Sequence, residues 1–356
     1  MGNFLAAPIT DKETERGEGN GLVFGVSAMQ GWRTNMEDSH VAVVNSTSFP
    51  AGCSVFAVCD GHGGKLAADM AAALMVDVFG ETMQNRKLFN ESSSGATGEG
   101  MPTPEDIGAC LRDAYMALDA RIKETPEVQY GSDQSGCTAI SAFLTSAHII
   151  VANSGDSRSV LAKNGRAVPM SFDHKPMNVS SERWGGRALE IERRRIEKAG
   201  GMVRANRVNG DLAVSRALGD FTYKQRNDLS AEEQQVSAEP DIKIEPRDGT
   251  EEFLIIACDG IWDVLTNDDA CNHVRMLMNK GESDMGLIAE DVLDVCLKLG
   301  SRDNMSVVIV KFPAAQIGSG EGVMGIRRER ARLEAEAMKD HETEEEQDEL
   351  DGTVRS

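Results

Sequence analysis

Short apolar runs that alternate with polar turns dominate the first half of this chain. LVFGVSAMQG and HVAVVNS alternate or run apolar, and CSVFAVCDG is a β-rich run that ends in a glycine turn, so the pattern predicts three strands before residue 62. The run CTAISAFLTSAHIIVANSGDSRSVLAKNG is interrupted at 145–146 and again at 154–156, which predicts three more strands in a hairpin series. FLIIACDG and the segment 305–312 predict two further buried strands.

Helical segments lie before and after these runs of strands. The segment 65–79 is rich in Ala, Leu and Met without proline, and 180–199 is a charged segment closed by Gly200 and Gly201. The other predicted helices cover 104–124, 268–279 and 284–299. Because the strands come in consecutive runs, we expect an α+β fold in which antiparallel sheets are covered by helices, rather than a doubly wound parallel sheet.

Composition shifts suggest where the folded domain begins and ends. Residues 1–20 are polar and unpatterned and predict a flexible lead-in, so the domain is expected to cover 21–313. Within it, 90–106 is rich in Ser, Gly, Pro and acids and predicts an inserted surface loop. The tail 314–356 contains a helix-forming stretch at 327–340 with a thin apolar stripe, followed by an acidic terminus expected to be disordered.

Charge restricts the partners of the protein. The net charge of -21 argues against binding to nucleic acid, which requires a basic face. The segment 340–356 holds eight acids and one Arg, a net of -7, so a third of the imbalance is local. Seven scattered cysteines without a C-x-x-C pair predict reduced, buried thiols. With no membrane-length apolar stretch and no signal-peptide pattern, we expect a soluble cytoplasmic protein, with nuclear or membrane-associated placement left open.

The sequence also bears on lipidation and on the oligomeric state. Met1-Gly2-Asn3 resembles the start of an N-myristoylation signal, but Ala6 stands where Ser or Thr is favoured, so lipidation is the less favoured alternative. No coiled-coil seam extends over three heptads, and we therefore expect a monomer.

Carboxylates recur where the predicted strands end. They are Glu37, Asp38, Asp60, Asp156, Asp259, Asp263 and Asp303. Each alone has an ordinary interpretation as a turn, a helix cap or a solvated loop residue. Carboxylates that converge from neighbouring strands repel one another unless cations neutralise them, and all-oxygen ligands favour Mg²⁺ or Mn²⁺. The spacings of zinc sites and of calcium loops are absent.

Eight blocks in this order resemble the PP2C-type metal-dependent serine/threonine protein phosphatases. They are GWRTNMEDSH, FAVCDGHGG, SGCTA, ANSGDSRSVL, DHKP, RVNGDLAVSRALGD, ACDGIWDVL and SRDNMSVVIV. The resemblance covers about residues 21–312 and implies a central β-sandwich flanked by helices in α-β-β-α layers, with two metal ions at one end of it. Phosphorylated proteins are then the expected partners and substrates.

The resemblance also implies a role for each acid. Asp60 bridges the two ions, the Gly61 carbonyl and Glu37 complete one site, and Asp259 and Asp303 complete the other. Asp38 acts on metal-bound water, while Asp156, Asp259 and Asp263 hold a weaker third ion. A water bridging two cations becomes acidic enough to supply hydroxide, so that no protein nucleophile is needed. The chain contains no G-x-S-x-G elbow for covalent catalysis.

Two basic residues are candidates for the substrate's phosphate and leaving group. Arg33 can donate two hydrogen bonds to phosphate oxygens, and it lies within five residues of Glu37 and Asp38. His62 follows Asp60 by two residues, so a protonated imidazole could donate to the leaving serine or threonine oxygen. A purely structural hydrogen bond remains the alternative for His62.

The segment 178–191 (NVSSERWGGRALEI) is expanded relative to the family pattern. It belongs to a region, about 175–236, that corresponds to a flap beside the active site, so we expect it to affect substrate choice. Asn304 could orient metal-bound water or cap the next segment, and Gly136 and Thr138 are expected to pack near the site.

Two other functions fit parts of this pattern. A phosphatase-like regulator that binds phosphoproteins without hydrolysing them is expected to lose metal ligands, whereas Glu37, Asp60, Asp259 and Asp303 are all present. A hydrolase of small phosphoesters would use the same two-metal chemistry. Hydrolysis of a phosphopeptide separates these alternatives from a protein phosphatase.

Overall fold

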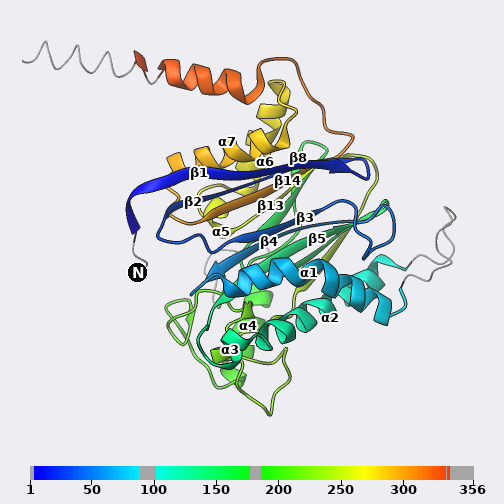
Figure 1. Ribbon diagram of the computed structural model, residues 1–356, viewed down its shortest axis with the longest axis vertical. Coiled ribbons are helices and arrows are strands. Elements are labelled where there is room, and N and C mark those ends of the chain that lie inside the picture. Colours follow the sequence, from blue (N-terminus) through cyan, green and yellow to red (C-terminus); the bar gives the residue numbers. More distant parts are fainter. Residues whose placement is uncertain (1–3, 89–101, 177–185, 334, 337–356) are drawn as a thin grey trace, which may run out of the picture.

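Two antiparallel sheets face each other in the computed structural model, which describes residues 4–88, 102–176, 186–333 and 335–336. Figure 1 shows the two sheets stacked between outer helices. The first sheet has the order β1 (Phe4–Gly19), β2 (Leu22–Arg33), β14 (Met305–Lys311), β13 (Glu251–Ala257), β7 (Arg158–Lys163) and β8 (Arg166–Pro169). The second has the order β12 (Asp241–Pro246), β6 (His148–Ser154), β5 (Gly136–Leu144), β4 (Ser54–His62) and β3 (Ser39–Val43), with β11 (Leu218–Gly219) paired to β5.

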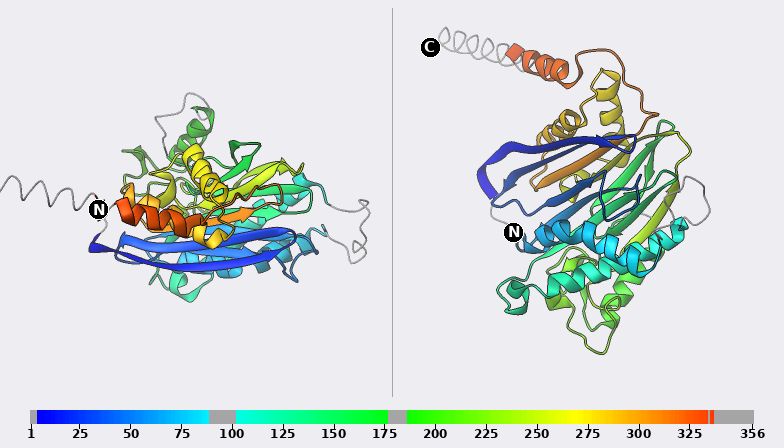
Figure 2. Two further views of the ribbon diagram at one scale, coloured as in Figure 1. Left: turned by 90° about the horizontal axis from the view of Figure 1, so that it is seen from above. Right: turned by 45° about the vertical axis from the view of Figure 1, so that its right-hand side comes forward.

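Helices cover the outer face of each sheet, as the two views in Figure 2 also show. The second sheet is covered by α1 (Leu66–Asn85) and α2 (Pro104–Lys123), and the first by α5 (Asp259–Trp262), α6 (Asn267–Asn279) and α7 (Met285–Lys298). Thr103 caps α2 and Thr266 caps α6, each in a capping box with an aspartate three residues later. The α-β-β-α layers predicted from the sequence are confirmed.

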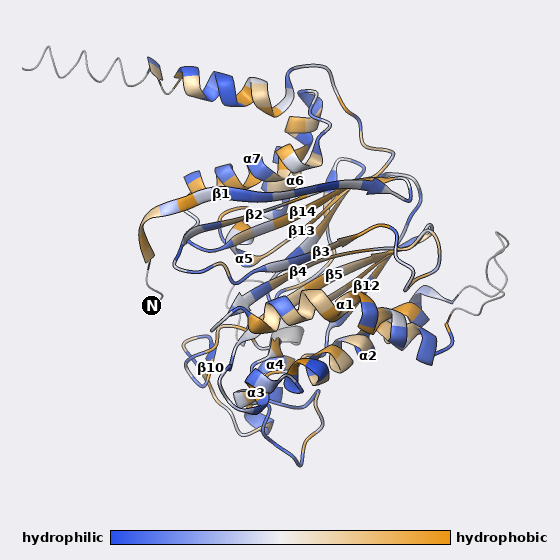
Figure 3. Cartoon of the chain, in the orientation of Figure 1, coloured by the Kyte–Doolittle hydropathy of each residue, from blue (hydrophilic) through white to orange (hydrophobic). Residues whose placement is uncertain are grey.

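The apolar side chains of the strands fill the space between the sheets. Phe24 of β2 and Phe56 of β4 meet there, with ring centroids 5.3 Å apart and an interplanar angle of 63°. Both rings are at most 4% exposed, and burial of one such side chain stabilises the fold by roughly 1.5–3 kcal/mol. Figure 3 shows hydrophobic residues on these strands and hydrophilic residues on most of β1.

The region after β8 forms a smaller unit beside the second sheet. It contains α4 (Gly186–Lys198), the two-stranded hairpin β9 (Val203–Arg204) and β10 (Arg207–Val208), and the 3₁₀ helix η2 (Phe221–Tyr223). Its own apolar cluster includes Ile196, Val208 and Val236, each fully buried. Between α2 and β5 lies the short helix α3 (Pro126–Gln129).

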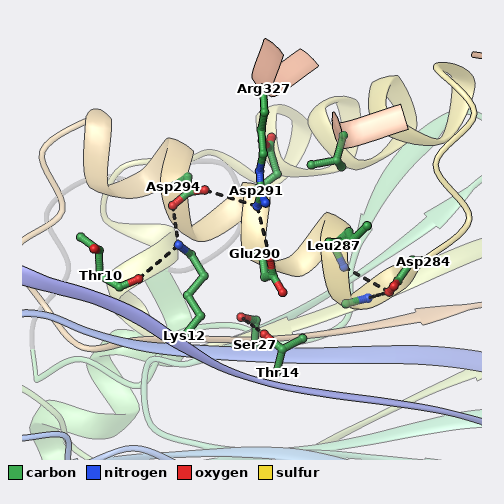
Figure 4. Close-up of polar contacts among 12 residues, drawn as sticks. Thr10, Lys12, Thr14, Ser27, Asp284, Leu287, Glu290, Asp291, Asp294 and Arg327 are labelled. Atoms are coloured by element: carbon green, nitrogen blue, oxygen red, sulfur yellow. Dashed lines mark hydrogen bonds and ion pairs between the residues drawn. The ribbon is translucent and has the colours of Figure 1, made fainter. Parts of the chain in front are cut away.

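The expected lead-in over residues 1–20 is wrong for the described part, because Phe4–Gly19 is the edge strand β1. It pairs antiparallel with β2 through a two-residue turn, in which Asn20 and Gly21 have φ of 53° and 74°. This left-handed pair fits the type I′ hairpin turn that Asn-Gly favours. β1 is held by ion pairs rather than by apolar burial. Lys12 Nζ lies 2.6 Å from Asp294 Oδ1 of α7 (Figure 4).

The beginning of the tail is also part of the fold. Residues 322–333 are helical, and Val323 is fully buried against the α6–α7 layer. Arg327 approaches Glu290 and Asp294 of α7 at 3.3 and 3.5 Å (Figure 4). Basic side chains from β1 and from the C-terminal helix therefore both form ion pairs with α7. The thin apolar stripe of residues 327–340 did not predict that this helix packs on the domain.

Several expectations fall partly or wholly outside the described residues. They concern lipidation at Gly2, most of the 90–106 loop, the first half of the 178–191 segment and the acidic terminus. None of the helices in the described part combines the length and apolar character that a bilayer crossing needs.

Candidate active site

The predicted site residues come together because antiparallel pairing brings alternate strand ends to the same edge of the sandwich. Arg33 ends β2 and Asp60 lies near the end of β4, whereas Asp303 lies just before β14 and Asp259 just after β13. Since β14 pairs with both β2 and β13, Arg33, Asp303 and Asp259 share one end of the first sheet. Asp60 belongs to the second sheet and lies close enough for the charges of Asp259 and Asp303 to act on it. Asp156, between β6 and β7, reaches the same end.

The carboxylates of this cluster act on one another. Burial raises the pKa of Asp60 well above its usual value, and the charges of Asp259, Asp38, Asp156 and Asp303 raise it further. The pKa of Asp259 is likewise well above its usual range, first through burial and then through Asp156, Asp303 and Asp263. Such mutual repulsion is the signature expected of an acidic site that is completed by cations.

Asp38 has one carboxylate oxygen that fits a cation or a polarised water. Its Oδ2 accepts a hydrogen bond from Ser306 Oγ at 2.7 Å, whereas its buried Oδ1 has no hydrogen-bond partner in the described structure. Possible ligand atoms of Asp38, Asp60 and Cys258 lie within 4.8 Å of one another. The Cys258 sulfur is already engaged, because it accepts from the Ser306 N–H at 3.1 Å, and burial raises the pKa of the thiol. Oxygen atoms are therefore the available ligands.

Gly61 and Glu37 are held in close contact. A Cβ at Gly61 would lie 2.2 Å from the Glu37 carbonyl oxygen, so only glycine allows this approach of the β2–β3 loop to β4. The Glu37 N–H donates to Asn304 Oδ1 at 3.0 Å, and Asn304 Nδ2 donates to the carbonyls of Gln30 and Asn35 at 2.9 Å. Asn304 thus fixes the loop that carries Glu37 and Asp38.

Arg33 borders the acid cluster. Its Nη2 lies 2.6 Å from Asp303 Oδ2, and its side chain is 41% exposed. The guanidinium is consequently reachable from solvent while being anchored to a predicted metal ligand. Gly31, with φ of 65°, lets β2 approach the Asp303 carbonyl, since a Cβ there would lie 2.7 Å from that oxygen.

Asp156 and Asp263 form an outer part of the cluster. Asp156 is 4% exposed and lies 3.0 Å from the ammonium of Lys175, a residue that the sequence reading did not single out. Burial lowers the pKa of Lys175, but the charge and hydrogen bond of Asp156, together with the charges of Asp173 and Asp259, raise the pKa more. The pKa of Asp263 is raised by burial first, with Lys175 opposing and Asp156 adding to the shift. Lys175 therefore supplies an internal positive charge beside these acids.

His62 is paired with Asp220, which the sequence reading also missed. His62 Nε2 and Asp220 Oδ2 are 2.7 Å apart, and the side chains are 31% and 6% exposed. Burial lowers the pKa of His62, but the charge of Asp220, its hydrogen bond and the charges of Asp156 and Glu37 together raise it more, so the net pKa lies above the usual value. Gly136 makes room for the pair, because a Cβ there would lie 2.3 Å from the Asp220 carboxylate and 2.6 Å from His62 Nε2.

Thr138 lies in register with Asp60 across β4 and β5, and its Oγ1 is 2.8 Å from Ser157 Oγ. It packs beside the site as expected. The sequence signal that could have identified Asp220 is its position as the last residue of the block RVNGDLAVSRALGD.

Stability without divalent ions should fall as the pH rises. Burial raises the folded-state pKa of Asp38 from 3.8 to about 6, so the folded protein holds more protons than the unfolded chain in this interval. A shift of this size corresponds to about 3 kcal/mol, which is fully present below pH 4 and is lost as the pH passes 6. In EDTA we expect the Tm to drop between pH 5 and pH 7, and Mn²⁺ to raise it most at the higher pH.

Thermal unfolding from pH 5 to 8, with EDTA and with Mn²⁺, measures this dependence. A Tm in EDTA that rises over the same interval would contradict it.

Comparisons with known proteins agree with one another. The family model "Protein phosphatase 2C" matches residues 22–305. Protein phosphatase 1A of Mus musculus is 39% identical over 324 residues, which cover 91% of this chain and 79% of that protein. Protein phosphatase 1B of Mus musculus is 39% identical over 323 residues, covering 91% and 78%. A phosphatase structure from a pathogenic strain of Toxoplasma gondii aligns with a TM-score of 0.67 at 24% identity, over 86% of this chain and 97% of that one.

Proposed function

Because this chain belongs to the protein phosphatase 2C family and is thereby a protein serine/threonine phosphatase, we propose that it removes phosphate from proteins at the acidic cluster described above. The observation that carries this proposal is the gathering of Asp60, Asp259 and Asp303, from distant parts of the chain, into one electrostatically coupled group. The family is metal-dependent, and the buried, unpartnered Oδ1 of Asp38 is consistent with a cation or polarised water at this place.

We assign the ligands of two Mg²⁺ or Mn²⁺ ions to Glu37, Asp60, the Gly61 carbonyl, Asp259 and Asp303. Asp156, Asp259 and Asp263 are proposed for a weaker third ion. Bound divalent ions supply two effects here: they neutralise the carboxylates, and they lower the pKa of water so that hydroxide is available at neutral pH. Asp38, whose Oδ2 accepts from Ser306, would keep Oδ1 free to accept a proton or a hydrogen bond.

Arg33 is proposed to bind the substrate phosphate. Its fork can donate to two phosphate oxygens, a geometry that lysine cannot reproduce. Its exposure of 41% leaves it accessible, and the ion pair with Asp303 keeps it at the cluster.

Arg33→Ala should lower kcat/KM for a phosphothreonine peptide by about 10- to 100-fold, mainly through KM, because hydrogen bonds to charged groups contribute about 1.5–3 kcal/mol. Arg33→Lys should recover only a part of the loss. Steady-state kinetics measures both, with Arg332→Ala, an exposed arginine of the C-terminal helix, as the control. Full activity in Arg33→Ala would remove Arg33 from phosphate binding.

His62 is proposed to donate a proton to the leaving serine or threonine oxygen. The nearby carboxylate of Asp220 favours the protonated imidazole and orients the ring through Nε2. Nδ1, which has no hydrogen-bond partner among the described residues, is then the donor. A general acid of this kind matters most for an alkoxide, which is a poor leaving group.

The direct test is hydrolysis of a phosphothreonine peptide in Mn²⁺ and in EDTA. We expect turnover only with the divalent ion, with re-addition of Mn²⁺ restoring it. Activity that survives chelation would refute the metal site. Activity toward small phosphoesters alone would favour a hydrolase of small phosphoesters. No activity toward any phosphopeptide would favour a regulator that binds phosphoproteins without hydrolysing them. Cytoplasmic location and a monomeric state stay predictions.

A further inference from the structure

A buried ion pair behind His62 joins α2 to the segment that carries Asp220. Asp119 of α2 and Lys224 are 11% and 7% exposed, and Asp119 Oδ1 accepts from Lys224 Nζ at 2.8 Å. The same oxygen accepts from the Gly219 backbone N–H at 2.8 Å. Lys224 Nζ donates in addition to the Ala217 carbonyl at 2.8 Å. One carboxylate therefore holds both ends of the turn from Ala217 to Lys224.

This turn has an unusual backbone. Gly219 and Asp220 have φ of 74° and 51°, and the left-handed conformation is disfavoured for a residue with a Cβ such as Asp220. Two backbone hydrogen bonds hold this conformation. The Asp220 N–H donates to the Ser135 carbonyl at 3.1 Å, and the Gly219 N–H donates to Asp119 Oδ1. The Asp220 carboxylate then points at His62 Nε2, 2.7 Å away.

We propose that Asp119 is a positioning residue, which acts with Lys224 to hold the Gly219–Asp220 turn and thereby places the Asp220 carboxylate on His62. This inference rests on the proposed role of His62 as the proton donor. Asp119 itself touches neither His62 nor the acid cluster in any contact described above. Its effect on hydrolysis should therefore be transmitted through Asp220 and His62 alone.

The variant Asp119→Asn tests this inference. The amide oxygen can still accept from Gly219, but it no longer neutralises Lys224, so a buried ammonium loses its counter-charge and the turn is released. Hydrolysis of a phosphothreonine peptide should fall about 10- to 100-fold in kcat, whereas hydrolysis of p-nitrophenyl phosphate, whose leaving group needs little protonation, should change less than about 3-fold. The Mn²⁺ affinity, measured by titration calorimetry, should stay within about 2-fold.

A double-mutant cycle with His62→Ala separates positioning from general damage. Once His62 is absent, Asp119→Asn should cause no further loss on the peptide. Asp291→Asn is the matched control: this aspartate of α7 is fully buried and bound by His273 and Arg330, far along the chain from the turn, and should not change the ratio between the two substrates. Thermal unfolding identifies folded variants.

If Asp119→Asn does not unfold cooperatively, Asp119→Glu takes its place. This variant keeps the charge but moves the carboxylate by one methylene, so the carboxylate can no longer accept from both Gly219 and Lys224 in their present positions. The same selective loss of phosphothreonine-peptide hydrolysis is expected. Equal losses on both substrates, or losses that multiply with those of His62→Ala, would overturn the inference. If His62→Ala is itself unselective, the proposed role of His62 fails as well, whereas a selective His62→Ala beside an unselective Asp119→Asn refutes the positioning role alone.

Discussion

Asp60→Asn should reduce hydrolysis of a phosphothreonine peptide by at least about 10³-fold while making the metal-free protein more stable. Asp60 lies at the centre of the cluster, where burial and four other carboxylates oppose its ionised form. Replacing its charge with an amide weakens the site for divalent ions, and a loss of about 10³ corresponds to about 4 kcal/mol of the barrier. The same replacement removes repulsion that the metal-free protein otherwise carries.

The effects on activity and on metal-free stability have opposite signs, so general damage to the fold cannot explain both. Activity and Mn²⁺ affinity should fall, whereas the Tm in EDTA at pH 7 should rise. Asp291→Asn serves as the control, because its carboxylate binds Arg330 and His273 and its loss should lower the Tm with little change in Mn²⁺ affinity. A Tm in EDTA that falls in Asp60→Asn as it does in the control would mean that Asp60 is not under the repulsion described.

The central part of this site could be predicted because it follows from local patterns. Each acid stands next to an apolar run, such as FLIIA before Asp259, and the runs are long enough to identify buried strands. Antiparallel pairing then brings alternate strand ends to one edge, so Asp60, Asp259 and Asp303 were expected to converge. The same runs, with the helices before and after them, predicted antiparallel sheets covered by helices, whereas the α-β-β-α layers followed from the resemblance to the family.

β1 was missed because its stability comes from partners that the local sequence does not reveal. Its residues are mostly polar, and it lies at the edge of the sheet, where one face is open to solvent. Lys12 and Arg16 gain their partners from α7, more than 260 residues later, as Arg16 does from Asp284 at 2.8 Å. Only the Asn20-Gly21 dipeptide gave a local signal, and it predicts a hairpin once a second strand is suspected.

Partners of the predicted site residues were missed for a related reason. Asp220 lies 158 residues after His62, and Lys175 lies in a loop whose direction depends on the fold around Asp156. A sequence pattern predicts which residue types stand at a strand end, but a side chain that arrives from another element is visible only in three dimensions. The Asp119–Lys224 pair, 105 residues apart in the chain, is a further case.

His62→Ala should slow hydrolysis of a phosphothreonine peptide by about 10²- to 10³-fold and hydrolysis of p-nitrophenyl phosphate by less than about 5-fold. General acid catalysis contributes about 10²–10⁴-fold where the leaving group is strongly basic, as the alkoxide of threonine is. The nitrophenolate ion is far less basic and leaves without a proton. The ratio of the two kcat values therefore reports on proton donation, which overall activity does not.

The alternative for His62 is a structural hydrogen bond to Asp220. Loss of such a bond would displace β11 and β5 together and affect both substrates to a similar degree, because Gly219 pairs with Gly136 beside the site. Asp220→Asn provides the matched comparison: it keeps a hydrogen-bond acceptor but removes the charge that favours imidazolium, so its selectivity should lie between those of the wild type and His62→Ala. Similar losses on both substrates in both variants would leave His62 with the structural role and require another proton donor at this end of the sandwich.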